Sequence, residues 1–290
     1  MISPNASINP QLQLLRNEGV RPTVGQSLGG WANRAEEKLQ SVPILGDAIS
    51  AARQRSGVDL SRAAANRALA PIGRNLPEGV TGNDAVLFVR RAMNEAYDDV
   101  VPHLTVTQDA PYRQAVGGLR QMVNQGAIST NARNAFQRFM RHEVDPLFQG
   151  QNAMTGETFK RLQGKITEQI QRSAGSTDAD QRLLSDAYRE LGTQLNALSI
   201  RTNPTLAPQL RAVNEGYANF KRLQRAASSV AAEDGAFTPA MLHNAVKAAD
   251  RSKDKARFAE GGALMQDLSA AGKNLLNNRV PNSGTVDRLL

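Results

Sequence analysis

The stretch that decides the fold is NDAVLFVRRAMNEAYDDVVPHL, residues 83–104. Its apolar residues recur at intervals of three and four: Val86, Val89, Met93, Tyr97, Val100 and Leu104. That spacing places them on one face of an α-helix whose opposite face is polar. Pro102 cannot continue a helix, so it marks the end of this one.

The same periodicity continues downstream. Further helices are predicted through Val116 to Gly126, from the cap Thr130 to Leu147, from Thr155 to Gly175, from Ser176 to Leu198, from Asn203–Pro204 to Val230, from Thr238–Pro239 to Ala249, and over residues 262–277. Ser, Thr and Asn accept hydrogen bonds from the first turn of a helix, and proline fits its first position. We expect the helix after Asn203 to be the longest, with Tyr217 on its apolar side.

Upstream of residue 83 the signals that start and end helices are more closely spaced. Asn9–Pro10 starts a short helix that Gly19 ends, and Thr23 caps a second one that reaches about Ser41. Two more helices are expected over residues 46–56 and 59–70, the latter ended by Pro71 and Gly73.

These patterns set the fold class. No alternating run of useful length predicts a β-strand. Hydrophobic residues make up 40% of the chain but aromatic residues only 4%, which favours helices packed through narrow aliphatic stripes. We therefore expect an all-α fold, an elongated multi-helix bundle or array with glycine and proline hinges and no β-sheet.

Composition shifts suggest five parts. They are a flexible N-terminus (residues 1–8), an N-terminal helical segment (9–73), a linker (74–82), a main helical domain (83–278) and a C-terminal tail (279–290). The linker is the clearest boundary because it carries Pro77, Gly79 and Gly82.

No segment has the length and apolarity of a membrane-spanning helix. The best run, residues 42–52, is short and interrupted by Pro43, Gly46 and Asp47. Residues 1–10 have neither the basic nor the apolar region of a secretory signal. We expect a protein that is not integral to a membrane.

Residue types that support catalysis or metal binding are sparse. The sequence has no cysteine, which excludes disulfides, thiolate metal sites and a cysteine nucleophile. His103, His142 and His243 lie in separate segments, none with a second ligand at metal-binding spacing. We expect no metal and no cofactor.

The carboxylates and glycines offer no stronger candidate. Consecutive acids on a helix, as in the pairs Glu36–Glu37, Asp98–Asp99 and Glu233–Asp234, are typical of a solvated surface. GQSLGG (Gly25–Gly30) resembles a phosphate loop, but no strand precedes it and no GK[ST] follows. We therefore expect no catalytic residues and a protein that is not an enzyme.

Basic residues carry more information. The net charge of +8 predicts attraction to a polyanion, which is nucleic acid, an anionic membrane surface or an acidic protein. Basic side chains at helical spacing follow a phosphate backbone without reading bases. The candidates for facing DNA are Arg53, Arg55, Arg62, Arg67, Arg74, Lys221, Arg222 and Arg225. The alternative is a solvated basic face, because we find no interleaved aromatic residues.

Several stretches resemble proteins of tailed bacteriophages. They are NPQLQLLRNEGVRPTVGQSLGGWANRAEEKLQSVPILGDAISAARQRS (Asn9–Ser56), LSRAAANRALAPIG (Leu60–Gly73), GETFKRLQGKI (Gly156–Ile166) and, between Gly262 and Thr285, GALMQDLSAAGKNLL and VPNSGT. They are similar, in order and over most of the chain, to segments of the internal virion, or DNA-ejection, proteins of short-tailed phages.

The resemblance implies a virion structural protein that is ejected with the genome. Such a protein enters the host cell envelope or periplasm and forms part of a homo-oligomeric helical tunnel for double-stranded DNA. Its implied partners are itself, other ejection or portal and tail proteins, and DNA through nonspecific phosphate contacts. A transglycosylase-like carboxylate motif and a membrane-crossing apolar hairpin, both known in this class, are missing from the sequence.

Two alternatives stay open. One is a static portal-associated, tail-associated or internal core protein of the virion that is never ejected. The other is a peptidoglycan-degrading virion enzyme, which would need one of the carboxylates in a cleft.

Overall fold

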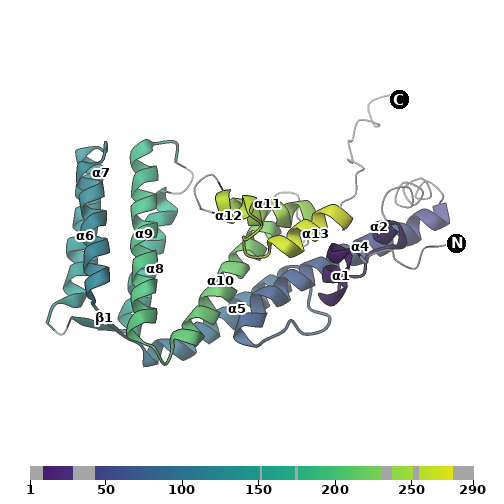
Figure 1. Ribbon diagram of the computed structural model, residues 1–290, viewed down its shortest axis with the longest axis horizontal. Helices are drawn as coiled ribbons and strands as arrows, with labels where there is room; N and C mark the ends of the chain where they lie inside the picture. The colour runs from purple at the N-terminus through teal and green to yellow at the C-terminus, as the bar shows by residue number, and fades with distance from the viewer. Residues whose placement is uncertain are drawn as a thin grey trace. The chain divides into compact units, whose positions relative to one another are not determined.

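The computed structural model describes residues 9–28, 43–150, 152–173, 176–229, 237–250 and 255–276. Over these ranges the chain is mostly helical, with one small two-stranded sheet, and is broadly all-α as expected (Figure 1). It divides into two compact units. Unit 1 is formed by Met1–Asn94 and Asn214–Leu290, and unit 2 by Glu95–Val213.

This division differs from the one expected from composition. The expected linker, residues 74–82, does connect two helices and is not helical before Gly82, where α5 begins, but both of those helices begin or lie in unit 1. The chain instead passes between the units inside α5 (Gly82–Val100) and inside α10 (Ala207–Ala227). Residues 214–276 belong with the N-terminal part because α13 (Gln266–Leu276) packs against α1 (Pro10–Asn17) and α4 (Pro43–Leu69).

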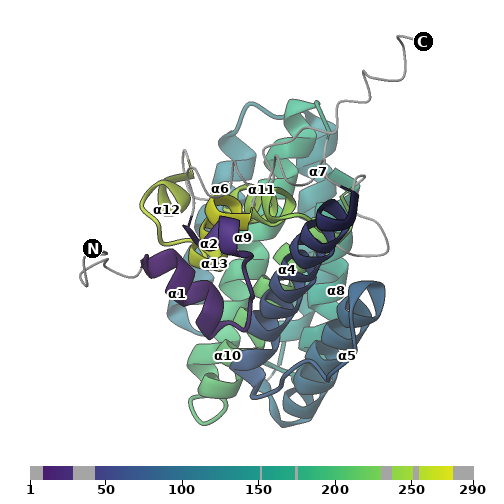
Figure 2. The ribbon, with the colours of Figure 1, turned by 90° about the vertical axis from the view of Figure 1, so that its right-hand side faces the viewer.

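Unit 1 also contains α2 (Val24–Leu28), η1 (Ala70–Ile72), α11 (Pro239–Ala249) and α12 (Ala256–Ala259). Figure 2 shows α13 beside α1 and α11. Large side chains that are fully buried in this unit include Leu15, Leu60, Leu69, Met93 and Phe220. Burial of these side chains is the main source of stability that the structure shows for unit 1.

The two helices expected over residues 46–56 and 59–70 are one helix, α4. Gly57 favours a break between them, but tertiary contacts on both sides of it hold the helix. Ser56 Oγ donates to the carbonyl of Arg21 at 2.7 Å, and the Asp59 carboxylate accepts from the Arg21 guanidinium at 2.9 Å. With 27 residues α4 is also longer than α10, which has 21.

Local start signals are confirmed at two expected positions in unit 1. Asn9 Oδ1 accepts from the N–H of Gln11 at 2.9 Å and begins α1. Thr238 Oγ1 accepts from the N–H of Met241 at 3.3 Å and begins α11. The helix expected from Thr23 to Ser41 is described only as α2, and its remainder lies outside the described residues.

Unit 2 is built around four helices: α6 (Ala110–Gln125), α7 (Thr130–Phe139), α8 (Gly156–Ser173) and α9 (Ala179–Thr202). Each of α6, α7 and α8 packs against α9 (Figure 1). Shorter turns complete the unit: η2 (Val101–His103), the π-helical η3 (Met140–Val144) and η4 (Asp145–Phe148). The continuous helix expected from Thr130 to Leu147 is therefore α-helical only to Phe139.

Several aromatic side chains contact one another in unit 2. The Tyr188 ring lies 5.5 Å from that of Phe136 and 5.1 Å from that of Phe139, and Tyr112 lies 5.4 Å from Phe148. Burial raises the pKa of Tyr188 to about 12. A low aromatic content thus coexists with local aromatic clusters in unit 2.

The expectation of no β-sheet is wrong in one place. β1 (Thr105–Thr107) and β2 (Ala153–Thr155) pair antiparallel, with Val106 opposite Met154 and both side chains buried. Three-residue strands are too short for an alternating pattern to stand out in the sequence.

Candidate functional site

The eight basic residues predicted to face DNA all lie in unit 1, on α4, on the connection after η1 and on α10. The structure separates them into two groups. Arg53, Arg62, Arg67 and Arg222 are wholly or partly buried, whereas Arg55, Arg74, Lys221 and Arg225 are exposed.

Arg62 holds the connection that follows η1. Its guanidinium donates to the carbonyls of Leu76 and Pro77, each at 2.7 Å. Leu76 is buried, and its N–H donates to Asn66 Oδ1 at 2.8 Å. Arg62 therefore satisfies backbone carbonyls of its own chain, which is a structural task.

Arg67 joins three helices. Its guanidinium lies 2.6 Å from a carboxylate oxygen of Glu18, which follows α1, and 2.8 Å from one of Asp267 on α13. Burial opposes the charge, but the hydrogen bonds that Arg67 donates to Asp267 and Glu18 outweigh it and raise the pKa of Arg67. Two carboxylates thus neutralise this cation within unit 1.

Arg53 and Arg222 are also directed inward. Arg53 is only 7% exposed. Arg222 donates to the carbonyl of Ala218 at 2.7 Å, and burial lowers its pKa while Asp250 acts in the opposite direction. Both cations are thus at least partly withdrawn from the surface of unit 1.

Lys221 has a different environment. Its Nζ lies 5.2 Å from the ring centre of Tyr217 and 5.9 Å from that of Phe220, and it donates to Gln224 Oε1 at 3.2 Å. Burial lowers the pKa of Lys221, and the positive charge of Arg90 on α5 lowers it further. Its neighbours are two aromatic rings, an amide and a second cation.

Two residues near Lys221, Tyr217 and Arg90, could not be recognised as its exposed neighbours from the sequence pattern. The apolar period places Tyr217 on the buried side of α10, but it is 38% exposed. Arg90 is exposed on α5, where only the adjacent Arg91 marks it in the sequence. The four-residue spacing of Tyr217, Lys221 and Arg225 is the signal that places these three on one line along the helix.

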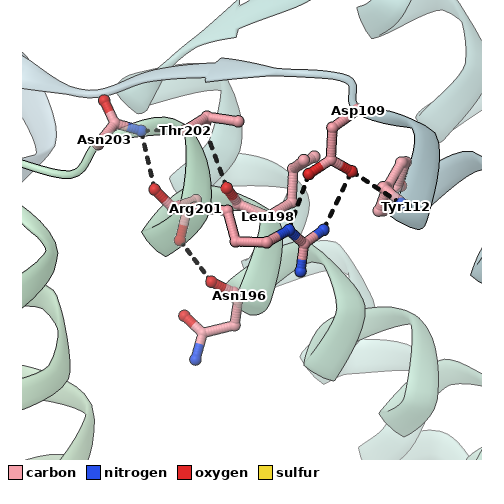
Figure 3. A network of polar contacts seen from close by, with 8 residues as sticks. Asp109, Tyr112, Asn196, Leu198, Arg201, Thr202 and Asn203 are labelled. Carbon is pink, nitrogen blue, oxygen red and sulfur yellow. Dashed lines mark hydrogen bonds and ion pairs between the residues drawn. The ribbon is translucent and has the colours of Figure 1, made fainter.

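A polar network in unit 2 links the start of α6 to α9 (Figure 3), and Asn203 extends it to Thr105 of β1. Asp109 caps α6 by accepting from the N–H of Tyr112 at 2.8 Å, and its carboxylate pairs with the Arg201 guanidinium at 2.7 and 3.0 Å. The Arg201 hydrogen bond is the largest cause that lowers the pKa of Asp109. These side chains bond to one another, and their pairing stabilises the unit.

Asn203 was expected to start α10 but ends α9 instead. Residues 204–206 form turns before α10 begins at Ala207. The side chain of Asn203 is buried and donates to the carbonyl of Ser199 at 2.8 Å. Its amide thus satisfies a carbonyl in the last turn of α9, as residues at helix C-termini often do.

The histidines and carboxylates considered for chemistry remain dispersed. His103 and His142 are exposed, and the His243 ring lies 5.3 Å from that of Phe258. Asp98 pairs with Lys160 at 2.6 Å. Within the described ranges no three His, Cys, Asp or Glu residues are placed to hold a metal ion.

Other sequence candidates lie partly outside the described residues. The acidic pairs Glu36–Glu37 and Glu233–Asp234 do, as do Gly29 and Gly30 at the end of the glycine-rich stretch. Among the helices that the structure describes, none combines the length and apolarity needed to span a bilayer.

Comparisons of the chain with models of protein families, with curated proteins and with solved structures found no match.

Proposed function

We propose that this chain is a structural, non-enzymatic protein of a tailed-phage virion. It is ejected with the genome and forms part of an oligomeric helical conduit for DNA across the host cell envelope. The observation that carries the proposal is the resemblance of five stretches, in the same order from Asn9 to Thr285, to internal virion proteins.

The way the helices begin supports this role. α1, α6, α7, α9 and α11 each start with a side chain that accepts from a backbone N–H two or three residues on: Asn9, Asp109, Ser129, Asp178 and Thr238. Such caps depend only on neighbouring residues, so they form again wherever the chain refolds. A chain that unfolds to pass a narrow channel benefits from start signals of this kind.

The arrangement of helices in unit 2 also supports the proposed role. Unit 2 is one continuous stretch of helices with a minimal sheet, and its most extensive helix pairing, α8 with α9, joins helices that are adjacent in sequence. Pairings between adjacent helices form quickly. With no cysteine, refolding requires no disulfide exchange in any compartment.

The test is the fate of the chain during infection. Virions carrying a labelled copy of the chain are allowed to release their genome, and spent particles are then separated from host membrane and periplasmic fractions. We expect the label to leave the particle and to sediment as an oligomer from the host fractions.

Recovery of all copies in the spent particle would overturn ejection and favour a static portal, tail or core protein. A zymogram on purified cell wall tests the non-enzymatic part of the proposal. Clearing that disappears when one carboxylate is replaced would contradict it.

A further inference from the structure

The outward side of α10 in unit 1 carries a line of aromatic and basic residues. Tyr217, Lys221 and Arg225 are spaced by four residues and all are exposed. Four residues span about 6 Å along a helix, so the two cations follow each other at that interval. The opposite side of the helix is committed to the core through Phe220, Leu223 and Ala226.

α5 adds a third cation near Lys221. Arg90 is exposed, and it is close enough to Lys221 for its charge to lower the lysine pKa. With Tyr217, Lys221 and Arg225 it forms what we call the α10 basic face.

Close packing fixes the α10 basic face. A Cβ atom added at Gly216 would lie 2.8 Å from the Ala68 carbonyl oxygen on α4 and 2.9 Å from Met93 Sδ on α5. Asn219 also donates to the carbonyl of Arg67 at 3.1 Å. α10 therefore approaches α4 and α5 too closely for another residue at position 216, and the cations sit on a rigid base.

The charge of this face is not compensated by ion pairs. Elsewhere in unit 1 basic residues meet carboxylates, as Arg21 does with Asp59 and Arg67 does with Asp267. Among the ion pairs formed by described residues, none includes Arg90, Lys221 or Arg225. Like charges held together raise the energy of the free protein, and a polyanion relieves it.

We propose that the α10 basic face binds the phosphate backbone of duplex DNA. The identity of the polyanion rests on the proposed function, whereas the site rests on the geometry of α5 and α10. Contact is through charge and is independent of base sequence.

DNA fits this face better than a lipid surface does. A helix that lies on a membrane buries its apolar side among the acyl chains. The apolar side of α10 is already buried in unit 1, through residues such as Phe220 and Leu223. The line outside that core carries Lys221 and Arg225 beside Tyr217.

The test measures binding of the full chain to a labelled duplex of about thirty base pairs in a salt series. Three phosphate contacts predict a slope of log affinity against log salt of about −2.7. The triple variant R90Q/K221Q/R225Q is expected to lose most of this slope and at least about tenfold in affinity at low salt.

A matched control removes the same charge elsewhere. R138Q/R141Q/R182Q changes three exposed arginines of unit 2 and is expected to keep the slope and affinity of the unaltered chain. Equal losses in both variants would reduce the effect to net charge and overturn the proposal, as would no loss in the first.

Two further experiments are needed. One tests whether binding depends on charge or on side-chain identity, and the other tests whether the ligand is DNA or lipid. R90K/R225K keeps the charge and is expected to bind as tightly as the unaltered chain, provided that helicity and melting temperature match in all variants. Vesicles of phosphatidylglycerol test the lipid alternative. Binding to vesicles that depends on the α10 basic face, without binding to the duplex, would overturn the DNA assignment.

Failure of the α10 basic face and failure of the proposed function are distinguishable. A chain that binds duplex through the α10 basic face but stays in the spent particle would overturn ejection alone. A chain that leaves the particle but binds duplex equally well in the triple variant would overturn the α10 basic face alone.

Discussion

The side-chain amide of Asn203 pairs with the backbone of Thr105 as a neighbouring β-strand would. Its Oδ1 accepts from the Thr105 N–H at 3.0 Å, and its Nδ2 donates to the Thr105 carbonyl at 3.0 Å. The residues are 98 positions apart, and Asn203 is only 8% exposed. One side chain thus both ends α9 and satisfies the backbone of β1.

Asn203→Ala should therefore be among the more damaging single changes in unit 2. It leaves the part-buried Thr105 N–H and C=O and the buried Ser199 carbonyl without the Asn203 side chain, and an unsatisfied buried polar group costs about 1–3 kcal/mol. We expect the free energy of unfolding in urea to fall by about 2–3 kcal/mol. Asn134→Ala, on the exposed side of α7, is the control and should change it by less than about 0.5 kcal/mol.

Two glycines of α8 should respond to alanine with opposite signs. A Cβ at Gly156 would lie 1.8 Å from the Val101 carbonyl oxygen, whereas one at Gly164 would meet nothing within 4 Å. Gly156→Ala forces backbone apart and should destabilise by about 1–3 kcal/mol. Gly164→Ala removes a flexible helical residue and should stabilise by about 1 kcal/mol. Thermal melts of both variants measure this, and the same sign for both would contradict the packing at Gly156.

Asp109 should make stability depend on acid pH. Its pKa is lowered in the folded chain, chiefly by the hydrogen bond from Arg201, so the unfolded chain binds its proton more readily. The stabilisation is present above the unfolded pKa, near 3.8, and is lost as pH falls through the folded value. Asp109→Asn keeps a capping side chain and should flatten this dependence.

Asp109→Ala removes the cap as well and should destabilise at pH 7 by about 1 kcal/mol. Urea unfolding at several pH values between about 2 and 7 distinguishes the two variants. An unchanged acid dependence in Asp109→Asn would show that the Arg201 pair contributes nothing.

His243 should also make stability depend on pH, in a higher pH range than Asp109 does. Burial, followed by the charges of Lys273 and Lys247, lowers its pKa below 6.5. The unfolded chain then takes up a proton that the folded chain resists, so stability should decrease as pH falls below about 6.5. His243→Gln should weaken this decrease between about pH 7.5 and 5.5. Steeper loss in the variant would contradict a lowered pKa at this histidine.

Arg67 and Arg55 test the separation of structural from exposed arginines. Arg67→Ala leaves Glu18 and Asp267 without their shared partner and should destabilise by about 1 kcal/mol, because these contacts form a partly buried network. Arg55→Ala, at an exposed position, should be neutral within about 0.5 kcal/mol. Chemical denaturation of both variants is the measurement, and equal effects would contradict the assignment of Arg67.

Features set by adjacent residues could be predicted from the sequence. The starts of α1 at Asn9–Pro10 and of α11 at Thr238–Pro239 depend on a side chain and a backbone N–H two or three residues away. The long apolar period from Val86 to Val100 likewise predicts α5 with nearly its observed bounds.

Features set by distant residues could not be predicted. Arg67 has the pattern of a surface cation until Glu18 and Asp267, 49 and 200 residues away, are brought beside it. Asn203 followed by proline has the pattern of a helix start, and only contact with Thr105 gives it another role. The candidate DNA face moved for the same reason, since folding withdrew Arg62 and Arg67 and exposed Tyr217.

The insertion of unit 2 within unit 1 has a consequence for the order of assembly. A chain that emerges from its N-terminus presents α4 with Leu60 and Leu69 long before α13, which covers that region of the core, is available. All residues of unit 2 are available first, while the hydrophobic core of unit 1 still lacks α13. An incomplete hydrophobic core can bind the missing segment of a second copy of the chain. This exchange is domain swapping, and it links identical chains.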